Sequence, residues 1–127
     1  MSMRYQGAWL QAGAFNPLVA PTPNYTYGLR SWGYNYYGQL GLSNTTNYSS
    51  PKQVGALTTW SNVSSGRYHS AAIKTDGTLW SWGLNNAGQL GQNTLTNYSS
   101  PKQVGTLTTW TTLFVGSTTY STLAIKN

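Results

Sequence analysis

The sequence predicts an all-β fold of propeller-type, four-stranded blades, with two blade-equivalents in the chain that are completed by another subunit. Residues 31–66 recur as 81–116 with 23 identical positions of 36, a period of fifty residues. Such a period marks a supersecondary unit that cannot bury its apolar face alone. Each period holds four short strand-like runs, the content of one propeller blade. Charged residues make up only 6%, while six Trp and ten Tyr are present, which argues against disorder.

The predicted domain organisation is an extended arm at 1–26 followed by two repeats at 27–127. Prolines within 16–24 keep that stretch extended and poor in backbone hydrogen bonds. Trp9 and Phe15 are large apolar side chains that a solvated tail does not need. We therefore expect the arm to dock on another subunit, with a flexible tail as the alternative.

Within the repeat, the clearest local signal is the Asp-Gly turn at 75–77 between the strand-like runs 70–74 and 78–82. Side chains of the second run alternate between small or aliphatic residues and tryptophan, as a strand requires. These runs are predicted to be the second and third strands of a blade.

The fourth strand is predicted at 102–104, entered through Pro101, since proline is tolerated where a strand begins. The first strand is predicted at 110–115, matching 60–65 one period earlier. From Leu29 onward the order is therefore third, fourth, first, second, third, fourth, first, second. One blade is complete, and a half-blade lies on each side of it.

The string from Gly66 to Gly83, followed by Asn85 and by Gly-Gln-Leu-Gly at 88–91, resembles the repeat of the regulator of chromosome condensation family. The resemblance covers 27–127 and implies a propeller, usually of seven blades. This chain departs from the family pattern first because it holds only two repeats. Its second copy has Thr119 at the offset of His69 and carries two extra residues before Lys126. Its first copy has Arg30 in place of Trp80.

The open strands at the two ends predict association. An unpaired sheet edge is a template for pairing with another chain. We expect the strand at Leu123 and Ile125 to pair with the strand at Leu29 and Trp32 of another copy. Head-to-tail contacts of this kind close into a ring where the rotation permits, here with an even number of blades. A two-blade sandwich and completion by a different protein are the alternatives.

Four tryptophans recur in register and are predicted to lie in blade cores: Trp32, Trp60, Trp82 and Trp110. Enzymatic chemistry is not expected, because the sequence contains one Asp and one His as acid–base side chains, with no carboxylate pair, metal-ligand cluster or phosphate-binding loop. Asp76 is expected to form hydrogen bonds with the backbone of its turn. His69 is expected to hydrogen-bond within its blade. No catalytic residue, cofactor or metal site is predicted.

The formal net charge is +6. Lys52 and Lys102 recur once per blade, so a ring would display them regularly as candidate contacts for a polyanion or a surface glycan; an ordinary solvated face is the alternative. The family's founding member binds chromatin and exchanges nucleotide on a small GTPase. Nucleotide exchange is not transferred to this chain, and a nucleic-acid partner is not expected.

The sequence thus predicts a non-enzymatic structural protein, present in many copies in a larger particle such as a phage virion, as a head decoration, fibre or tail protein. Its partners would be copies of itself or another assembly subunit. The alternative is a free-standing propeller-like module that binds a protein, glycan or nucleic acid. No membrane span or signal peptide is predicted, because the apolar run at 12–15 is short and is broken by Pro17. The expected location is a virion or extracellular particle, otherwise the cytoplasm.

Overall fold

The computed structural model describes residues 27–56 and 59–127, and over these residues the protein is all-β, with eight strands and no helix. The strands are β1 (Arg30–Gly33), β2 (Tyr48–Gln53), β3 (Trp60–Ser65), β4 (His69–Lys74), β5 (Leu79–Gly83), β6 (Tyr98–Gln103), β7 (Trp110–Val115) and β8 (Thr122–Lys126). No helix in this part of the chain could cross a membrane. The predicted arm at 1–26, with Trp9 and Phe15, lies outside the described residues.

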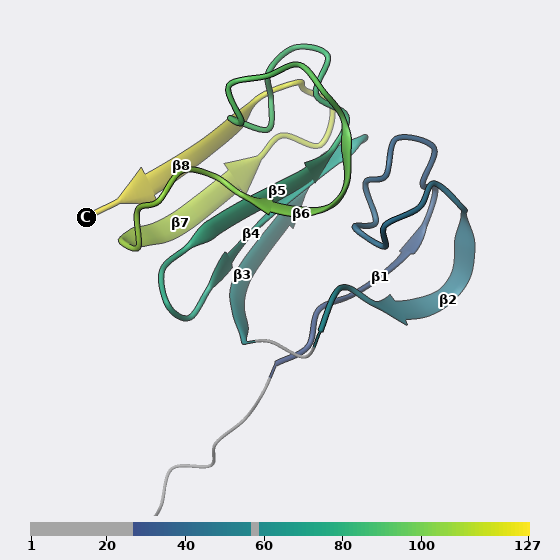
Figure 1. Cartoon of the computed structure of the whole chain (residues 1–127), viewed down its shortest axis with the longest axis horizontal. Coiled ribbons are helices and arrows are strands. Elements are labelled where there is room, and N and C mark those ends of the chain that lie inside the picture. Colours follow the sequence, from purple (N-terminus) through teal and green to yellow (C-terminus); the bar gives the residue numbers. More distant parts are fainter. Residues whose placement is uncertain (1–26, 57–58) are drawn as a thin grey trace, which may run out of the picture.

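The strands form one four-stranded antiparallel sheet and two antiparallel pairs. The sheet has the order β3-β4-β5-β6, and the pairs are β1-β2 and β7-β8. Figure 1 shows the pairs on opposite flanks of the four-stranded sheet. The predicted all-β, propeller-type fold class is confirmed, with one complete blade and a half-blade on either side, while completion by another subunit stays a prediction. We call β3–β6 the full blade, β1–β2 the leading half-blade and β7–β8 the trailing half-blade.

One cluster of the core lies between the full blade and the trailing half-blade. Ala71, Ile73 and Leu79 of the full blade pack with Leu113 of β7, and all four are at most 5% exposed. Alternate residues of β4 point to this side, while Ser70 between them points to the leading half-blade and donates a hydrogen bond to the Gln39 carbonyl at 2.9 Å. Both faces of the full blade are therefore covered, which explains why its two central strands are buried.

The fourth strand of the blade is longer than predicted. β6 begins at Tyr98, whereas the sequence predicted a start at Lys102, so Pro101 lies inside the strand. β6 is the last strand of its sheet and pairs only with β5. A proline is tolerated here because an edge strand forms no backbone hydrogen bonds to a neighbour on its outer side, where a missing N–H costs nothing.

The prediction that all four recurring tryptophans lie in blade cores is wrong for Trp32. Trp82 is 2% exposed, and Trp60 and Trp110 are half-buried, but Trp32 is 58% exposed. The tryptophan of the third strand is covered by the preceding blade. For Trp32, no preceding blade exists among the described residues.

Candidate functional site

The loops that follow β1 and β5 are each organised by the same arrangement of hydrogen bonds, which we call the frame. Asn85 is fully buried, and its amide donates to the carbonyls of Thr94 and Thr96 at 2.8 and 3.0 Å. Its side-chain oxygen accepts the Leu90 N–H at 3.0 Å. Asn35 has the same role in the first loop. Because the asparagine organises the backbone, the neighbouring side chains are free to vary.

The two loops differ in the side chains that lie next to the buried asparagine. The first loop carries Tyr34, Tyr36 and Tyr37 where the second carries Leu84, Asn86 and Ala87. The second loop folds in the same way without tyrosines, so the frame does not require them. Three aromatic residues that the frame does not need, in a repeat otherwise so similar, make this loop a candidate binding surface.

The tyrosines form one cluster with residues that precede β4. Tyr34 stacks on Tyr36, with ring centroids 6.4 Å apart and an interplanar angle of 13°. Tyr37 meets both Tyr36 and Tyr68 edge to face at 5.0 Å. The Arg67 guanidinium lies over the Tyr68 ring at 4.9 Å. We call these five residues the tyrosine cluster.

The tyrosine cluster is accessible, and the phenol of Tyr34 stays neutral. Tyr36 is 65% exposed and Tyr34 is 53% exposed. The pKa of Tyr34 is raised above its ordinary value, mainly by desolvation and then by the neighbouring phenols, while Arg67 opposes the shift. The cluster therefore offers aromatic area, hydroxyl groups and one guanidinium. Tyrosine and arginine are enriched at protein interfaces and among the residues that dominate binding energy.

His69 makes a structural hydrogen bond, but the prediction that this bond lies within its own blade is wrong. His69 is 1% exposed, and its Nε2 lies 3.1 Å from the Thr122 hydroxyl of β8, so it links the full blade to the trailing half-blade. Burial lowers the pKa of His69, with a smaller opposing effect from the backbone of Ser121. In the register of the strands the counterpart of His69 is Ser121, because the second repeat has two additional residues in this loop.

Asp76 lies in the turn between β4 and β5, where the sequence placed it. Its carboxylate accepts hydrogen bonds from the Thr78 N–H and hydroxyl at 3.0 and 2.6 Å, and these bonds lower the pKa of Asp76. Within residues 27–56 and 59–127 no group of three or more acidic, histidine or cysteine residues could hold a metal ion.

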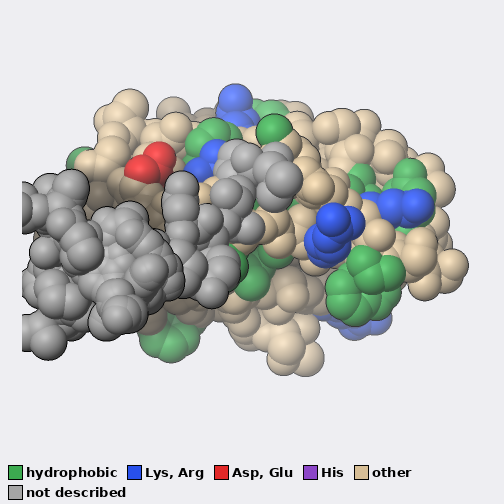
Figure 2. Space-filling model, turned by 90° about the horizontal axis from the view of Figure 1, so that it is seen from below, with side chains coloured by type: hydrophobic (Ala, Val, Ile, Leu, Met, Phe, Trp, Pro, Cys, Tyr) green, Lys and Arg blue, Asp and Glu red, His purple; other side chains and the backbone are tan. Residues whose placement is uncertain are grey.

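The two candidate polyanion contacts lie on the outer strands of the blades. Lys52 on β2 and Lys102 on β6 are exposed, and each ammonium lies over a tyrosine ring of its own strand, at 5.3 and 5.1 Å. Charged residues on such strands also discourage edge-to-edge pairing. On the face in Figure 2 the basic side chains lie apart from one another. A polyanion contact stays a prediction.

The predicted interface residues lie at the two open edges. Trp32, Leu123 and Ile125 are 58%, 63% and 53% exposed. Leu29 is half-buried, and its carbonyl accepts the Val54 N–H at 2.9 Å. The structure therefore places Trp32 on β1, with Leu29 just before it, and the other two residues on β8, on the opposite flank of the molecule (Figure 1).

Comparison with protein families identifies the repeat. The model of the regulator of chromosome condensation (RCC1) repeat matches residues 30–73 and 76–123, and a second RCC1 repeat model matches residues 60–89. A search of curated proteins gave no significant match.

Solved structures with a similar fold include the crystal structure of human WBSCR16, with 26% identity and a TM-score of 0.61. They also include yeast RCC1 (Prp20) bound to Kap60, with 21% identity and a TM-score of 0.62. Prp20p of Saccharomyces cerevisiae, whose structure was reported with its binding to Gsp1p and histones, gives 21% and 0.61. Each similarity covers 71% of this chain but only 24–25% of the other chain.

Proposed function

The chain belongs to the regulator of chromosome condensation (RCC1) repeat family, and from that premise we propose that it is a non-enzymatic protein-binding module of the propeller type. The observation that carries the proposal is the tyrosine cluster. It consists of accessible aromatic residues on a loop whose framework is repeated elsewhere in the chain without them.

The choice of a protein partner follows from the chemistry of the cluster. Phenol rings and a guanidinium give large, rigid contact area with hydrogen-bonding tips, the composition of protein-binding hot spots. A site for a polyanion would instead gather several cations, and Arg67 is the single cation of this cluster. Yeast RCC1 itself binds Kap60, and Prp20p was studied for binding to Gsp1p and histones, which supports protein recognition by this fold.

The two functions predicted from the sequence are not equally supported. The similarity to propeller proteins favours the binding module, which was the alternative. Nothing in these comparisons indicates a virion component, and that function and its location stay predictions. The proposed module is non-enzymatic because the described residues offer recognition chemistry at the tyrosine cluster, whereas His69 and Asp76 are engaged in structural hydrogen bonds.

Selection from a random peptide display library tests the proposal. Peptides are selected on the wild-type chain and measured against Tyr36→Asn with Tyr37→Ala, which installs the residues of the second loop. We expect most selected peptides to lose at least tenfold in affinity, because hot-spot residues typically contribute 2 kcal/mol or more, which is about thirtyfold.

Leu95→Thr is the matched control. Leu95 is 66% exposed in the second loop, and Thr45 occupies its place in the first. This variant removes an exposed apolar side chain but should leave peptide affinity unchanged. Selected peptides that bind the doubly substituted chain as tightly as the wild type, or a library that yields no binder, would contradict the proposal.

A further inference from the structure

The two open edges occupy complementary places in the repeat. β8 follows β7 as β4 follows β3, and β1 leads into β2 as β5 leads into β6. In the full blade β4 pairs with β5. Among the described residues, β8 has no strand in the place of β5, and β1 has none in the place of β4. Each edge thus lacks the strand type that the other edge presents.

The internal pairing fixes the register that a second copy would adopt. Val63 pairs with Ala72 in the full blade, and its counterpart Leu113 pairs with Ala124. The strand β8 is therefore β4 displaced by 52 residues, while β1 is β5 displaced by 50. Applying these shifts to the five observed β4–β5 pairs gives five pairs across copies. Two of them join Leu123 with Ser31, and Ile125 with Leu29.

Trp82 shows how the third strand of a blade is seated against the preceding blade. Its indole Nε1 donates to the Gln39 carbonyl at 2.9 Å, and its ring meets Trp60 at 6.1 Å. A methyl group on Gly41 would come within 2.8 Å of that nitrogen, so the glycine makes room for the indole. The counterparts of these three contact residues, fifty residues later, are Gln89, Trp110 and Gly91.

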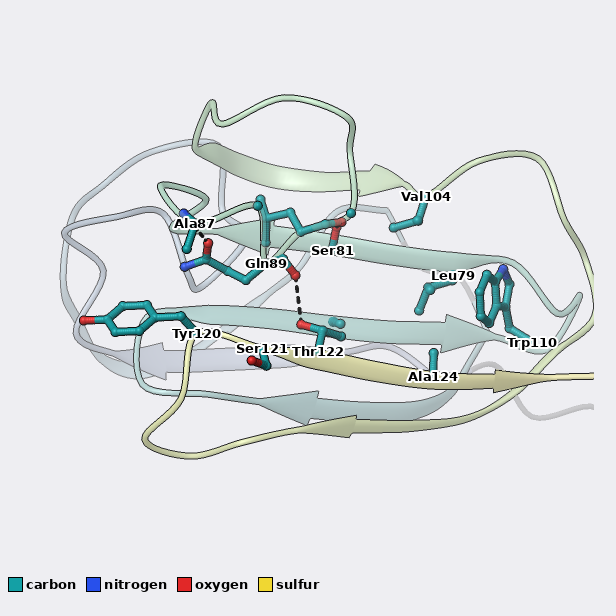
Figure 3. A pocket seen from close by; sticks show the side chains of 14 residues that line it. Leu79, Ser81, Ala87, Gln89, Val104, Trp110, Tyr120, Ser121, Thr122 and Ala124 are labelled. Atoms are coloured by element: carbon teal, nitrogen blue, oxygen red, sulfur yellow. Dashed lines mark hydrogen bonds between the residues drawn. The ribbon is translucent and has the colours of Figure 1, made fainter.

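Those three counterparts line a cavity of about 380 Å³ between the full blade and the trailing half-blade. In Figure 3, Leu79 and Ser81 of the full blade border the cavity together with Gln89, Trp110 and Ala124. A methyl group on Gly91 would meet only Val104, at 3.5 Å. This cavity corresponds to the space that the Trp82 indole fills one blade earlier, but here no indole fills it. We call it the tryptophan socket.

The side chain that matches the socket is present on the other edge of the same chain. Trp32 is the counterpart of Trp82 by the fifty-residue period, yet it is 58% exposed. In the paired register Trp32 of a second copy would lie opposite Thr122, as Trp82 lies opposite Ser70. That position places its indole on the side of β8 that faces the socket.

A second cavity, of about 410 Å³, lies between the leading half-blade and the full blade. Leu29, Ser31 and Leu40 line it on one side, and Val63 and Trp82 line it on the other. It lacks the second strand of the leading blade. In the full blade that strand supplies two apolar side chains to the core, Ala71 and Ile73. Their counterparts are the exposed Leu123 and Ile125.

We infer that two copies of this chain associate head to tail, with β8 of one copy pairing antiparallel to β1 of the next. Trp32 of the next copy enters the tryptophan socket, and Leu123 and Ile125 enter its second cavity. The joint creates a four-stranded sheet, with β7 and β8 from one copy and β1 and β2 from the next. This sheet corresponds to the full blade and packs against its neighbours in the same way. The contact is heterologous, so it closes into a ring or extends. Tyr34 and Arg67 of the tyrosine cluster also line this second cavity, whereas Tyr36 and Tyr37, on which the test of the proposed function depends, do not.

The solution mass of the chain tests this inference, by light scattering over a concentration series and by native mass spectrometry. We expect oligomers for the wild type. Trp32→Ala should raise their dissociation constant at least thirtyfold, as for a hot spot that fills a pocket. The control is Tyr36→Ala, which removes an exposed aromatic side chain from the same half-blade and should not change the mass. A wild-type monomer at all concentrations, or equal effects of both substitutions, would overturn the inference.

Disulfide trapping tests the register in a chain that has no natural cysteine. The Lys74 N–H bonds to the Thr78 carbonyl, and the Leu84 N–H to that of Tyr68. Antiparallel pairs alternate, so Ala71 with Ser81 is a non-hydrogen-bonded pair, whose side chains are closest. Its equivalent between copies is Leu123 with Ser31.

The variant Ser31→Cys with Leu123→Cys should therefore form cross-linked oligomers on mild oxidation. The variant Ser31→Cys with Ile125→Cys moves one cysteine two positions along the same face, beyond disulfide reach, and should cross-link far less. Equal cross-linking of both variants, or none in either, would overturn the proposed register. Folding of each variant is verified by its circular dichroism spectrum.

Discussion

Gly41→Ala and Gly91→Ala form a matched pair, because the two glycines occupy the same position of the repeat. Both have a left-handed backbone, with φ of +72° and +64°. This conformation costs an alanine about 1–2 kcal/mol. At Gly41 the added methyl also lies 2.8 Å from the Trp82 indole nitrogen, and such overpacking costs about 1–3 kcal/mol more. We expect losses of unfolding free energy of about 2–5 kcal/mol for Gly41→Ala and about 1–2 kcal/mol for Gly91→Ala.

Urea unfolding, followed by tryptophan fluorescence and circular dichroism at low protein concentration, measures this difference. Low concentration limits association, so the socket of Gly91 stays empty. At high concentration Gly91→Ala should also weaken self-association, because its methyl group lies where Trp32 of a second copy would enter. Equal destabilisation by the two substitutions at low concentration would refute the conclusion that one seat is filled within the chain and the other is not.

Two further predictions concern buried hydrogen-bonding groups. Burial lowers the pKa of His69 below its ordinary value, so the unfolded chain binds its proton more readily; the free energy of unfolding should fall as the pH drops from about 7 to 5. Urea unfolding across this range should show a weaker dependence for His69→Gln, and an unchanged dependence would exclude His69 as the cause. Asn85→Ala leaves the Leu90 N–H without its acceptor and should cost about 2–4 kcal/mol, against less than about 0.5 kcal/mol for the exposed Asn86→Ala in the same assay.

The order of strands was predictable because each blade is specified locally. The Asp-Gly turn fixes the pairing of β4 with β5, and the repeat transfers the assignment to β1 and β8. The length of β6 was not predictable in this way, because a proline at an edge strand and a proline before a strand look the same in sequence. The distinction depends on which strand has a neighbour on its outer side.

Burial was less predictable than strand order. Trp32 and Trp82 occupy identical sequence contexts, Ser-Trp-Gly followed by a residue and asparagine, yet one is exposed and the other buried. The cause is the neighbouring sheet, which the residue's own repeat does not encode. The tyrosine cluster was missed for the opposite reason. Identities between the repeats predict the shared structure, whereas the signal for the cluster is a difference, at Tyr36 and Tyr37, within an otherwise shared loop.

The tryptophan socket is already organised before any partner enters it. The Thr122 hydroxyl donates to the Gln89 carbonyl at 2.8 Å, as the Ser70 hydroxyl donates to the Gln39 carbonyl at 2.9 Å in the filled seat. The loop and β8 are thus held in the geometry that seats an indole, although the socket contains none. Preorganisation reduces the conformational entropy lost on association. The ordering required at this joint is therefore confined mainly to the exposed side chains that enter the two cavities.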